Sequence, residues 1–292
     1  MHPAPSVIIF TVLSGLGFGL LTWLGLGVIA PTGWVAFAFY VIAYGLAVVG
    51  LLASTFHLGN PKNALLAFSQ WRTSWLSREA WLSLAALAVI GLYAVGSIFF
   101  DNHIKILGLL GAILSLATVF ATSMIYAQLP TIPRWNHWST TALFILFSLS
   151  GGALLAGQSR LAGALFLALT IALVFTWKSG DTRFARSGSN MSTATGLGTA
   201  GQIRMVESPH TGTNYLLREM VHVVGRKHID KLRVISLLCA GVIPAILLLA
   251  TPAGHILALT VVAIHLLGAF TARWLFFAEA EHVVGLYYGK RS

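Results

Sequence analysis

The chain has 292 residues, of which 57% are hydrophobic and only 9% are charged, and its formal net charge is +10. This composition excludes a soluble globular domain and indicates an integral membrane protein, for which we expect lipid and no nucleic acid as a partner. The single cysteine, Cys239, excludes a disulfide within the chain and a cysteine-ligated cluster.

Eight stretches are long enough to cross a membrane as helices, since a span takes about 20 apolar residues. Their apolar runs are continuous and lack the alternation of a lipid-facing strand, which predicts an all-α, polytopic bundle of eight transmembrane helices. We expect the first stretch to be retained as a helix because no basic region precedes it. A single membrane domain over 1–292 is predicted, with spans near 6–30, 34–56, 80–100, 104–126, 139–157, 161–178, 233–251 and 256–277 and a loop at 179–232.

Small residues in the first span predict close helix packing. Gly15 and Gly19 have the G-x-x-x-G spacing that lets two helix backbones approach each other. Packing alone accounts for these glycines.

The segment from Ser54 to Glu79 concentrates polar and aromatic residues between the second and third spans. His57 ends one span and Glu79 begins the next, so both are predicted at one depth. A histidine gains or loses a proton near neutral pH, and a carboxyl group can exchange protons as well. The pair is therefore a candidate for proton exchange with a bound molecule.

A quinone fits such a boundary, because its isoprenoid tail needs lipid while its carbonyl oxygens need donors and, on reduction, two protons. Flat apolar rings and fixed positive charges are available nearby in Trp71, Trp75, Trp81, Arg72 and Arg78. The same residues also fit a tryptophan belt, arginines on the cytoplasmic side and a histidine that caps a helix. The residues alone leave both interpretations open.

The remaining histidines do not favour a b-type haem, which needs two axial ligands at similar depth on facing helices. His57 lies at a helix end, His265 near the middle of the last span and His255 at the opposite surface. We therefore expect no haem, and we expect His265 to hydrogen-bond between helices.

Charge predicts the orientation of the bundle. Sixteen of the 18 Lys and Arg residues fall on the side of both termini, counting the C-terminal tail, and only Lys105 and Arg160 fall on the other. Basic loops stay in the cytoplasm, so both termini are predicted there. The loop at 179–232 makes this face large enough to dock a soluble partner. Residues 215–228 of the loop are predicted to form an interfacial helix. Binding of anionic lipids would explain part of the positive charge of this face.

Two other classes of function make different demands on the sequence. A transporter predicts ionisable groups and broken helices near mid-depth, and no Asp, Glu, Lys or Arg falls near the centre of a predicted span. A purely structural tether keeps the docking face but treats His57 and Glu79 as ordinary boundary residues.

Several motifs resemble the membrane anchor subunits of DMSO-reductase-type molybdoenzyme complexes over the whole chain. They are His57-Leu-Gly-x-Pro61, WRTSWLSRE at 71–79, PRWN at 133–136 and SPHTGTNYLLREM at 208–220. The resemblance implies that His57 and Glu79 bind a quinone, either ubiquinone or menaquinone. To this site we add Arg78, Trp75, Arg72, Tyr126, Arg134 and Trp135.

The resemblance also implies partners, a molybdopterin catalytic subunit and an iron–sulfur subunit, with no metal in this chain. The predicted orientation puts these partners on the cytoplasmic face of a bacterial inner membrane. Exported DMSO reductases are expected to place these partners on the periplasmic face. The predicted orientation and the N-terminal MHPAPSVIIFTVLSG are more similar to anchors of the sulfite-oxidising type, in which quinone is reduced. A quinol-oxidising anchor for S- or N-oxide reduction is the alternative.

Overall fold

The computed structural model describes residues 1–56, 61–198, 201–207, 210–221, 228–252 and 254–289. In these ranges the regular structure is entirely helical, and eight helical stretches are long and apolar enough to cross a membrane, as predicted. Seven are single α-helices and one is interrupted. The spans are α1 (Pro5–Gly25), α2 (Gly33–Thr55), α3 (Trp75–Phe99), α4 (Lys105–Ala127), α5 (Trp138–Leu155), α6 (Ser159–Arg186), α8–α9 (Ile229–Ala250) and α10 (His255–Ala278).

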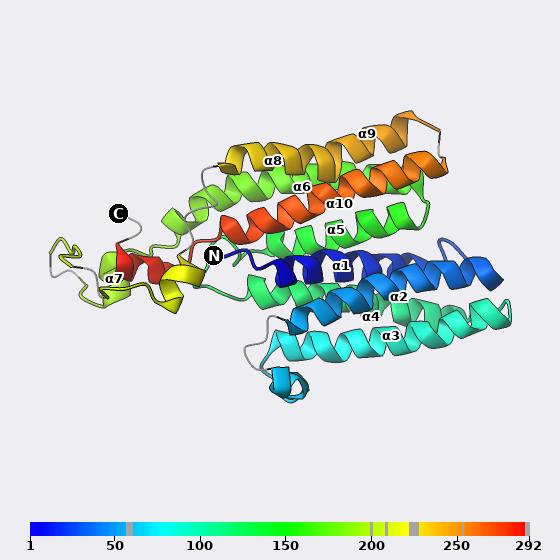
Figure 1. The fold of residues 1–292 in the computed structure, drawn as a ribbon, viewed down its shortest axis with the longest axis horizontal. Coiled ribbons are helices and arrows are strands. Elements are labelled where there is room, and N and C mark those ends of the chain that lie inside the picture. The colour runs from blue at the N-terminus through cyan, green and yellow to red at the C-terminus, as the bar shows by residue number, and fades with distance from the viewer. Residues whose placement is uncertain (57–60, 199–200, 208–209, 222–227, 253, 290–292) are drawn as a thin grey trace.

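The helix α1 lies at the centre of the bundle, with α2, α3 and α4 on one side and α5, α6, α8, α9 and α10 on the other (Figure 1). It is the most buried span and packs directly against α2, α4, α5 and α10. One apolar core joins α1–α4 to α5 and α10, and a second joins α5, α6, α9 and α10. The chain therefore folds around its own first helix.

Close approach of backbones explains the central place of α1. A Cβ atom on Gly17 would collide with the backbone of Ala47 in α2, and one on Gly19 would collide with the backbone of Ser148 in α5. The predicted partner of Gly19, Gly15, has open space around its Cα instead. The small-residue packing is therefore real, but Gly17 rather than Gly15 shares it with Gly19.

The seventh span is interrupted between α8 (Ile229–Leu237) and α9 (Ile243–Ala250) by a π-helical turn, η4 (Leu238–Val242). Pro244 has no N–H for the carbonyl of Ala240, four residues before it. Nδ1 of His265 in α10 lies 3.0 Å from that carbonyl oxygen and is its side-chain partner. The predicted helix-to-helix hydrogen bond of His265 is thus present.

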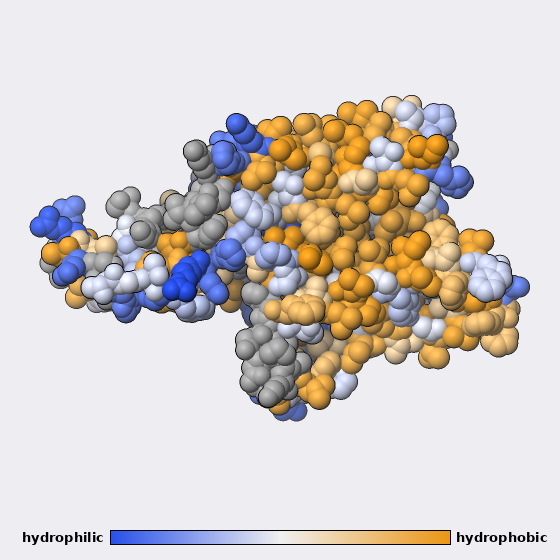
Figure 2. Space-filling view, in the orientation of Figure 1, coloured by the Kyte–Doolittle hydropathy of each residue, from blue (hydrophilic) through white to orange (hydrophobic). Residues whose placement is uncertain are grey.

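The first residues of the chain and the end of its described part lie at one end of the bundle (Figure 1). The same end carries the short helices η1 (Pro61–Phe68), α7 (Met191–Thr195), η2 (Leu216–Met220) and η5 (Val283–Tyr288). Hydrophobic side chains cover the length of the helices, and hydrophilic ones gather at the two ends (Figure 2). The predicted loop at 179–232 starts later than expected, because α6 continues to Arg186, and the described part of the predicted interfacial helix is the single turn η2.

Candidate functional site

A large cavity of about 790 Å³ lies at the end of the bundle that carries the termini. It is bounded by the first residues of the chain, the last turn of α2, η1, the first turns of α3 and the last turn of α4. We call it the boundary cavity. Its volume is in the range of cofactor and ligand sites, roughly 300–1,000 Å³.

Glu79 is the acidic group that α3 presents to this cavity. Leu76, Ala80, Ser83 and Leu84 line the cavity with it, because residues three and four apart share one face of a helix. The side chain of Glu79 is buried, and among the described residues its carboxylate has one side-chain partner, the hydroxyl group of Thr122 in α4. A buried carboxyl group therefore borders a mainly apolar space.

Two further predicted residues, Tyr126 and Trp135, form an aromatic part of the wall. Their rings meet edge to face with centroids 5.2 Å apart. The indole Nε1 of Trp135 donates to the carbonyl oxygen of Phe276 at 2.9 Å, and its ring stacks on that of Phe276. This anchor to α10 fixes the plane of Trp135 beside the cavity.

Another wall is formed by η1, which Trp81 holds in place. Nε1 of Trp81 donates to the carbonyl oxygen of Phe68 at 3.0 Å, and the two rings meet edge to face. Leu65, Ala67 and Phe68 of η1 line the cavity. Trp81 itself lies outside, so its part in the site is to position η1.

Arg78 organises the turn before α3, and neither Arg78 nor Arg72 lines the cavity. Arg78 donates from Nε to the carbonyl oxygen of Trp71 at 3.0 Å and from Nη2 to that of Arg72 at 2.7 Å. Its guanidinium group lies over the ring of Trp75, 4.3 Å from the centroid, while Trp75 packs against Phe120. Trp71 and Arg72 are exposed.

Arg134 lies in a separate cluster of charges. It pairs with Asp181 at 2.5 Å and Glu279 at 2.9 Å, and Arg233 pairs with the same two carboxylates, each at 2.6 Å. We call these four residues the ion-pair cluster. Its members come from the α4–α5 connection, α6, α8 and the end of α10, so Arg134 ties helices together and is not part of the cavity wall.

His57 lies outside the described residues, while Ser54 and Thr55 at the end of α2 line the cavity. Among the lining residues that the sequence did not predict, two have ionisable side chains, His2 and Glu219. The backbone N–H of His2 donates to the carbonyl oxygen of Glu219 at 2.7 Å. No motif or spacing signals that contact, because it joins segments more than two hundred positions apart.

One side of the boundary cavity faces the outer surface of the bundle. Leu52, Leu65, Leu76 and Leu84 line it, and all four are also exposed on α2, η1 and α3. An amphiphile can therefore enter with its tail in the membrane and its polar head near Glu79. The arrangement suits a flat, membrane-soluble molecule that exchanges a proton with a carboxyl group.

By sequence, the chain is similar to a known protein family and to known proteins. The family model described as DMSO reductase anchor subunit (DmsC) matches residues 1–289. A subunit of the sulfite dehydrogenase of Allochromatium vinosum is 31% identical, with 99% of each chain aligned. The anaerobic dimethyl sulfoxide reductase chain YnfH of Escherichia coli is 31% identical over 43% of this chain and 45% of its own length. No solved structure shows significant similarity.

Proposed function

The chain belongs to the DMSO reductase anchor subunit family, and from this premise we propose that it binds a quinone in the boundary cavity and reduces it with electrons from an iron–sulfur partner. As a multi-pass membrane anchor of that family, it works with catalytic and electron-transfer subunits. Its own contribution is to hold the quinone and to supply protons at Glu79 and His57.

The observation that carries this proposal is the burial of Glu79 in the wall of a large apolar cavity that reaches the outer surface. A structural tether needs no such space. Ubiquinone and menaquinone both combine a flat ring with a long apolar tail, and the aromatic wall of Tyr126 and Trp135 suits that ring. The molybdenum and iron–sulfur chemistry of the complex is assigned to partner subunits, and we assign no haem to this chain.

Sulfite oxidation is the reaction that we assign to the complex, with electrons passing from sulfite to the quinone pool. Support comes from the sulfite dehydrogenase relative, which aligns with the chain over nearly its whole length. The second candidate is a quinol-oxidising anchor for reduction of S- or N-oxides, which the partial match to a dimethyl sulfoxide reductase chain favours. The two differ in the direction of electron flow through the same cavity.

The membrane that we assign is the bacterial inner membrane, with the iron–sulfur and molybdopterin subunits on its cytoplasmic side. The excess of Lys and Arg on the side of the termini supports this orientation. The boundary cavity lies at the same end of the bundle. A quinone bound there would be close to a cluster in a docked partner.

The test is sulfite-dependent reduction of decylubiquinone by the purified complex, comparing the native chain with Glu79→Gln and His57→Ala. We expect each variant to lose about 100-fold in quinone turnover, the size typical of losing a general acid. Sulfite oxidation with ferricyanide as acceptor should stay unchanged, because the catalytic subunit is intact.

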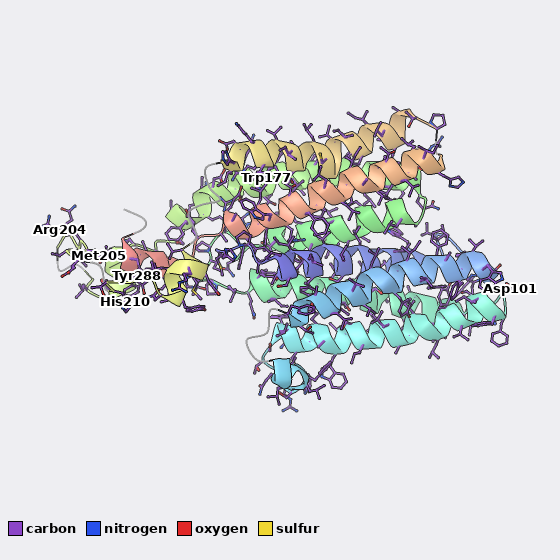
Figure 3. All side chains as sticks on the ribbon, in the orientation of Figure 1. Asp101, Trp177, Arg204, Met205, His210 and Tyr288 are labelled. Atoms are coloured by element: carbon purple, nitrogen blue, oxygen red, sulfur yellow. The ribbon has the colours of Figure 1, made fainter. Side chains whose placement is uncertain are left out.

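Asp101→Asn is the matched control, because it makes the equivalent change of a carboxylate at the opposite end of the bundle (Figure 3). Asn also tolerates the left-handed backbone of that position, where φ is 48°. Native quinone turnover in both Glu79→Gln and His57→Ala would contradict the proposed site. Absence of sulfite-dependent activity in every form would favour the S- or N-oxide candidate.

A further inference from the structure

Behind Glu79 lies a second, smaller space among α1, α4, α5 and α10, which we call the inner cavity. It offers about 20 Å³ to the centre of a water molecule, and one water needs roughly 10–15 Å³ measured in this way. Apolar residues form much of its lining. Its polar lining consists of Thr11, Ser14, Thr122, Ser148, His265 and Arg273.

Thr122 connects the two cavities. Its side chain lines the inner cavity, while its hydroxyl oxygen is in hydrogen-bonding contact with the carboxylate of Glu79, which lines the boundary cavity. The same oxygen lies 3.0 Å from the carbonyl oxygen of Thr118. A hydroxyl group has one proton to donate and can also accept. Thr122 can therefore accept a hydrogen bond from neutral Glu79 while donating to the carbonyl oxygen of Thr118, or turn and donate to the carboxylate.

Arg273 is a buried cation without a buried anion. Counting charges along the sequence assigns it to the C-terminal tail, but it lies within α10 and its side chain is only 6% exposed. Its guanidinium group stacks on Phe144, 3.7 Å from the ring centroid. The ion pairs between described residues do not include it. An unpaired charge inside a protein is costly, so its N–H groups need another acceptor.

His265 has a buried acceptor atom that lacks a donor among the described residues. Nδ1 pairs with the carbonyl oxygen of Ala240, and a carbonyl can only accept, so Nδ1 donates. In a neutral imidazole the other ring nitrogen is then an acceptor. Nε2 is buried and has no hydrogen-bond partner among the described residues. The inner cavity thus has a donor, Arg273, and an acceptor, His265, that a water molecule would satisfy together.

We propose that the inner cavity holds water and that Thr122 and Arg273 are positioning residues that stabilise the carboxylate of Glu79 after it has protonated the bound quinone. The hydroxyl of Thr122 donates directly to the carboxylate. The water is oriented by Arg273 and His265. Its dipole transmits the effect of the positive charge of Arg273 to Thr122 and, through Thr122, to Glu79. This inference rests on the proposed function of the boundary cavity.

Protons and electrons balance in this step. Two electrons reach the quinone from the iron–sulfur partner, and the O–H bond of Glu79 breaks as a new O–H bond forms on one quinone oxygen. The second proton is assigned to His57, as in the proposed function. Glu79 is left as a carboxylate in an apolar wall, where a hydrogen bond to a charged group contributes more than one between neutral groups. Without Thr122 the proton transfer is slower, although the quinone still binds.

Thr122→Val tests the first half of the proposal, because it removes only the hydroxyl group. The assay is reduction of decylubiquinone by the assembled complex with reduced benzyl viologen as donor. We expect kcat to fall about tenfold or more, the size of one lost hydrogen bond to a charged group, with KM unchanged. The solvent deuterium isotope effect should rise as proton transfer becomes limiting, and Thr122→Ser should restore the native values.

Thr118→Val is the matched control. Thr118 lies one turn earlier on α4, is equally buried, and donates its hydroxyl proton to the carbonyl oxygen of Leu114. It lines neither cavity. We expect native kcat and a native isotope effect in this variant. Equal kinetics in Thr118→Val and Thr122→Val would overturn the role of Thr122.

Arg273→Met and Arg273→Lys test the second half. We expect Arg273→Met to show the same loss of kcat and larger isotope effect as Thr122→Val, and Arg273→Lys to retain most of the activity because it keeps the charge. Native kinetics in Arg273→Met would overturn the inference. Glu79→Gln and His57→Ala in the same assay separate the two proposals. If both are fully active, the proposed quinone site fails. If both are slow while the Thr122 and Arg273 variants are not, only the inference about Thr122 and Arg273 fails.

Discussion

At the scale of single residues, His137 shows how a hydrogen-bond network makes stability depend on pH. Its Nδ1 accepts from the backbone N–H of Ser139 at 3.2 Å, capping α5, and lies 3.0 Å from Nη2 of Arg183. Both contacts require the neutral ring. Burial and the charge of Arg183 together lower the pKa of His137 below its usual value.

The sign of the effect follows from that direction. Above the ordinary histidine pKa of about 6.5 the ring is neutral in both the folded and the unfolded chain. As the pH falls below this value, the unfolded chain binds the proton first, so stability is lost. We expect the thermal stability of the detergent-solubilised complex to fall between pH 7 and pH 5, and less steeply in His137→Asn, whose side chain still caps a helix. Parallel curves for the two proteins would contradict this assignment.

How far the sequence predicts the candidate site differs from residue to residue. Glu79, Tyr126 and Trp135 line one cavity. Their common depth follows from the ends of the spans, but the spacing does not show which way Tyr126 and Trp135 face. Arg134 has a long side chain. Its pairing with Asp181 and Glu279 depends on packing between helices that are distant in sequence. Hydroxyl groups such as Thr122 carry no signal at all, because most of them in these spans bond to their own helix.

At the scale of elements, the packing of α1 predicts which glycine is essential. Gly19→Ala places a methyl group against the backbone of Ser148, and backbone cannot move aside as a flexible side chain can. We expect a loss of about 1–3 kcal/mol in unfolding free energy, typical of overpacking. Gly45→Ala, in the neighbouring helix α2 with open space at the position of the added methyl group, should be neutral or up to about 1 kcal/mol more stable. Denaturant titration of both variants in detergent measures this, and equal stabilities would refute the packing argument.

The presence of the helices could be predicted from the sequence, but their irregularities could not. Hydropathy and length place all eight spans, because a lipid environment demands about 20 apolar residues in helical form. The π-helical turn η4 has only Pro244 as a local signal, and its partner His265 is remote in sequence. The sequence could not show that Gly17 and Gly19, and not Gly15, contact neighbouring backbones. A small residue shows only that close approach is allowed.

At the scale of the whole molecule, the end with the termini is held together by charge. The ion-pair cluster joins the α4–α5 connection, α6, α8 and α10 around two carboxylates, and Arg233 also lies over the ring of Trp177. Two arginines therefore neutralise two acids within the bundle, and Arg273 is buried. The cations left on the surface of this end are accordingly fewer than the sequence count, although they still outnumber those at the opposite end.

This asymmetry makes the orientation of the bundle testable. Asp101 lies at one end and Arg204 at the other (Figure 3). With Cys239→Ala as background, we introduce Asn102→Cys or Arg204→Cys, since both positions are exposed. A membrane-impermeant maleimide should label Asn102→Cys in right-side-out vesicles and Arg204→Cys only in inverted ones, because basic segments are retained in the cytoplasm. The reverse pattern would place the boundary cavity at the periplasmic face, where an exported oxide reductase docks, and would make quinol oxidation the better assignment.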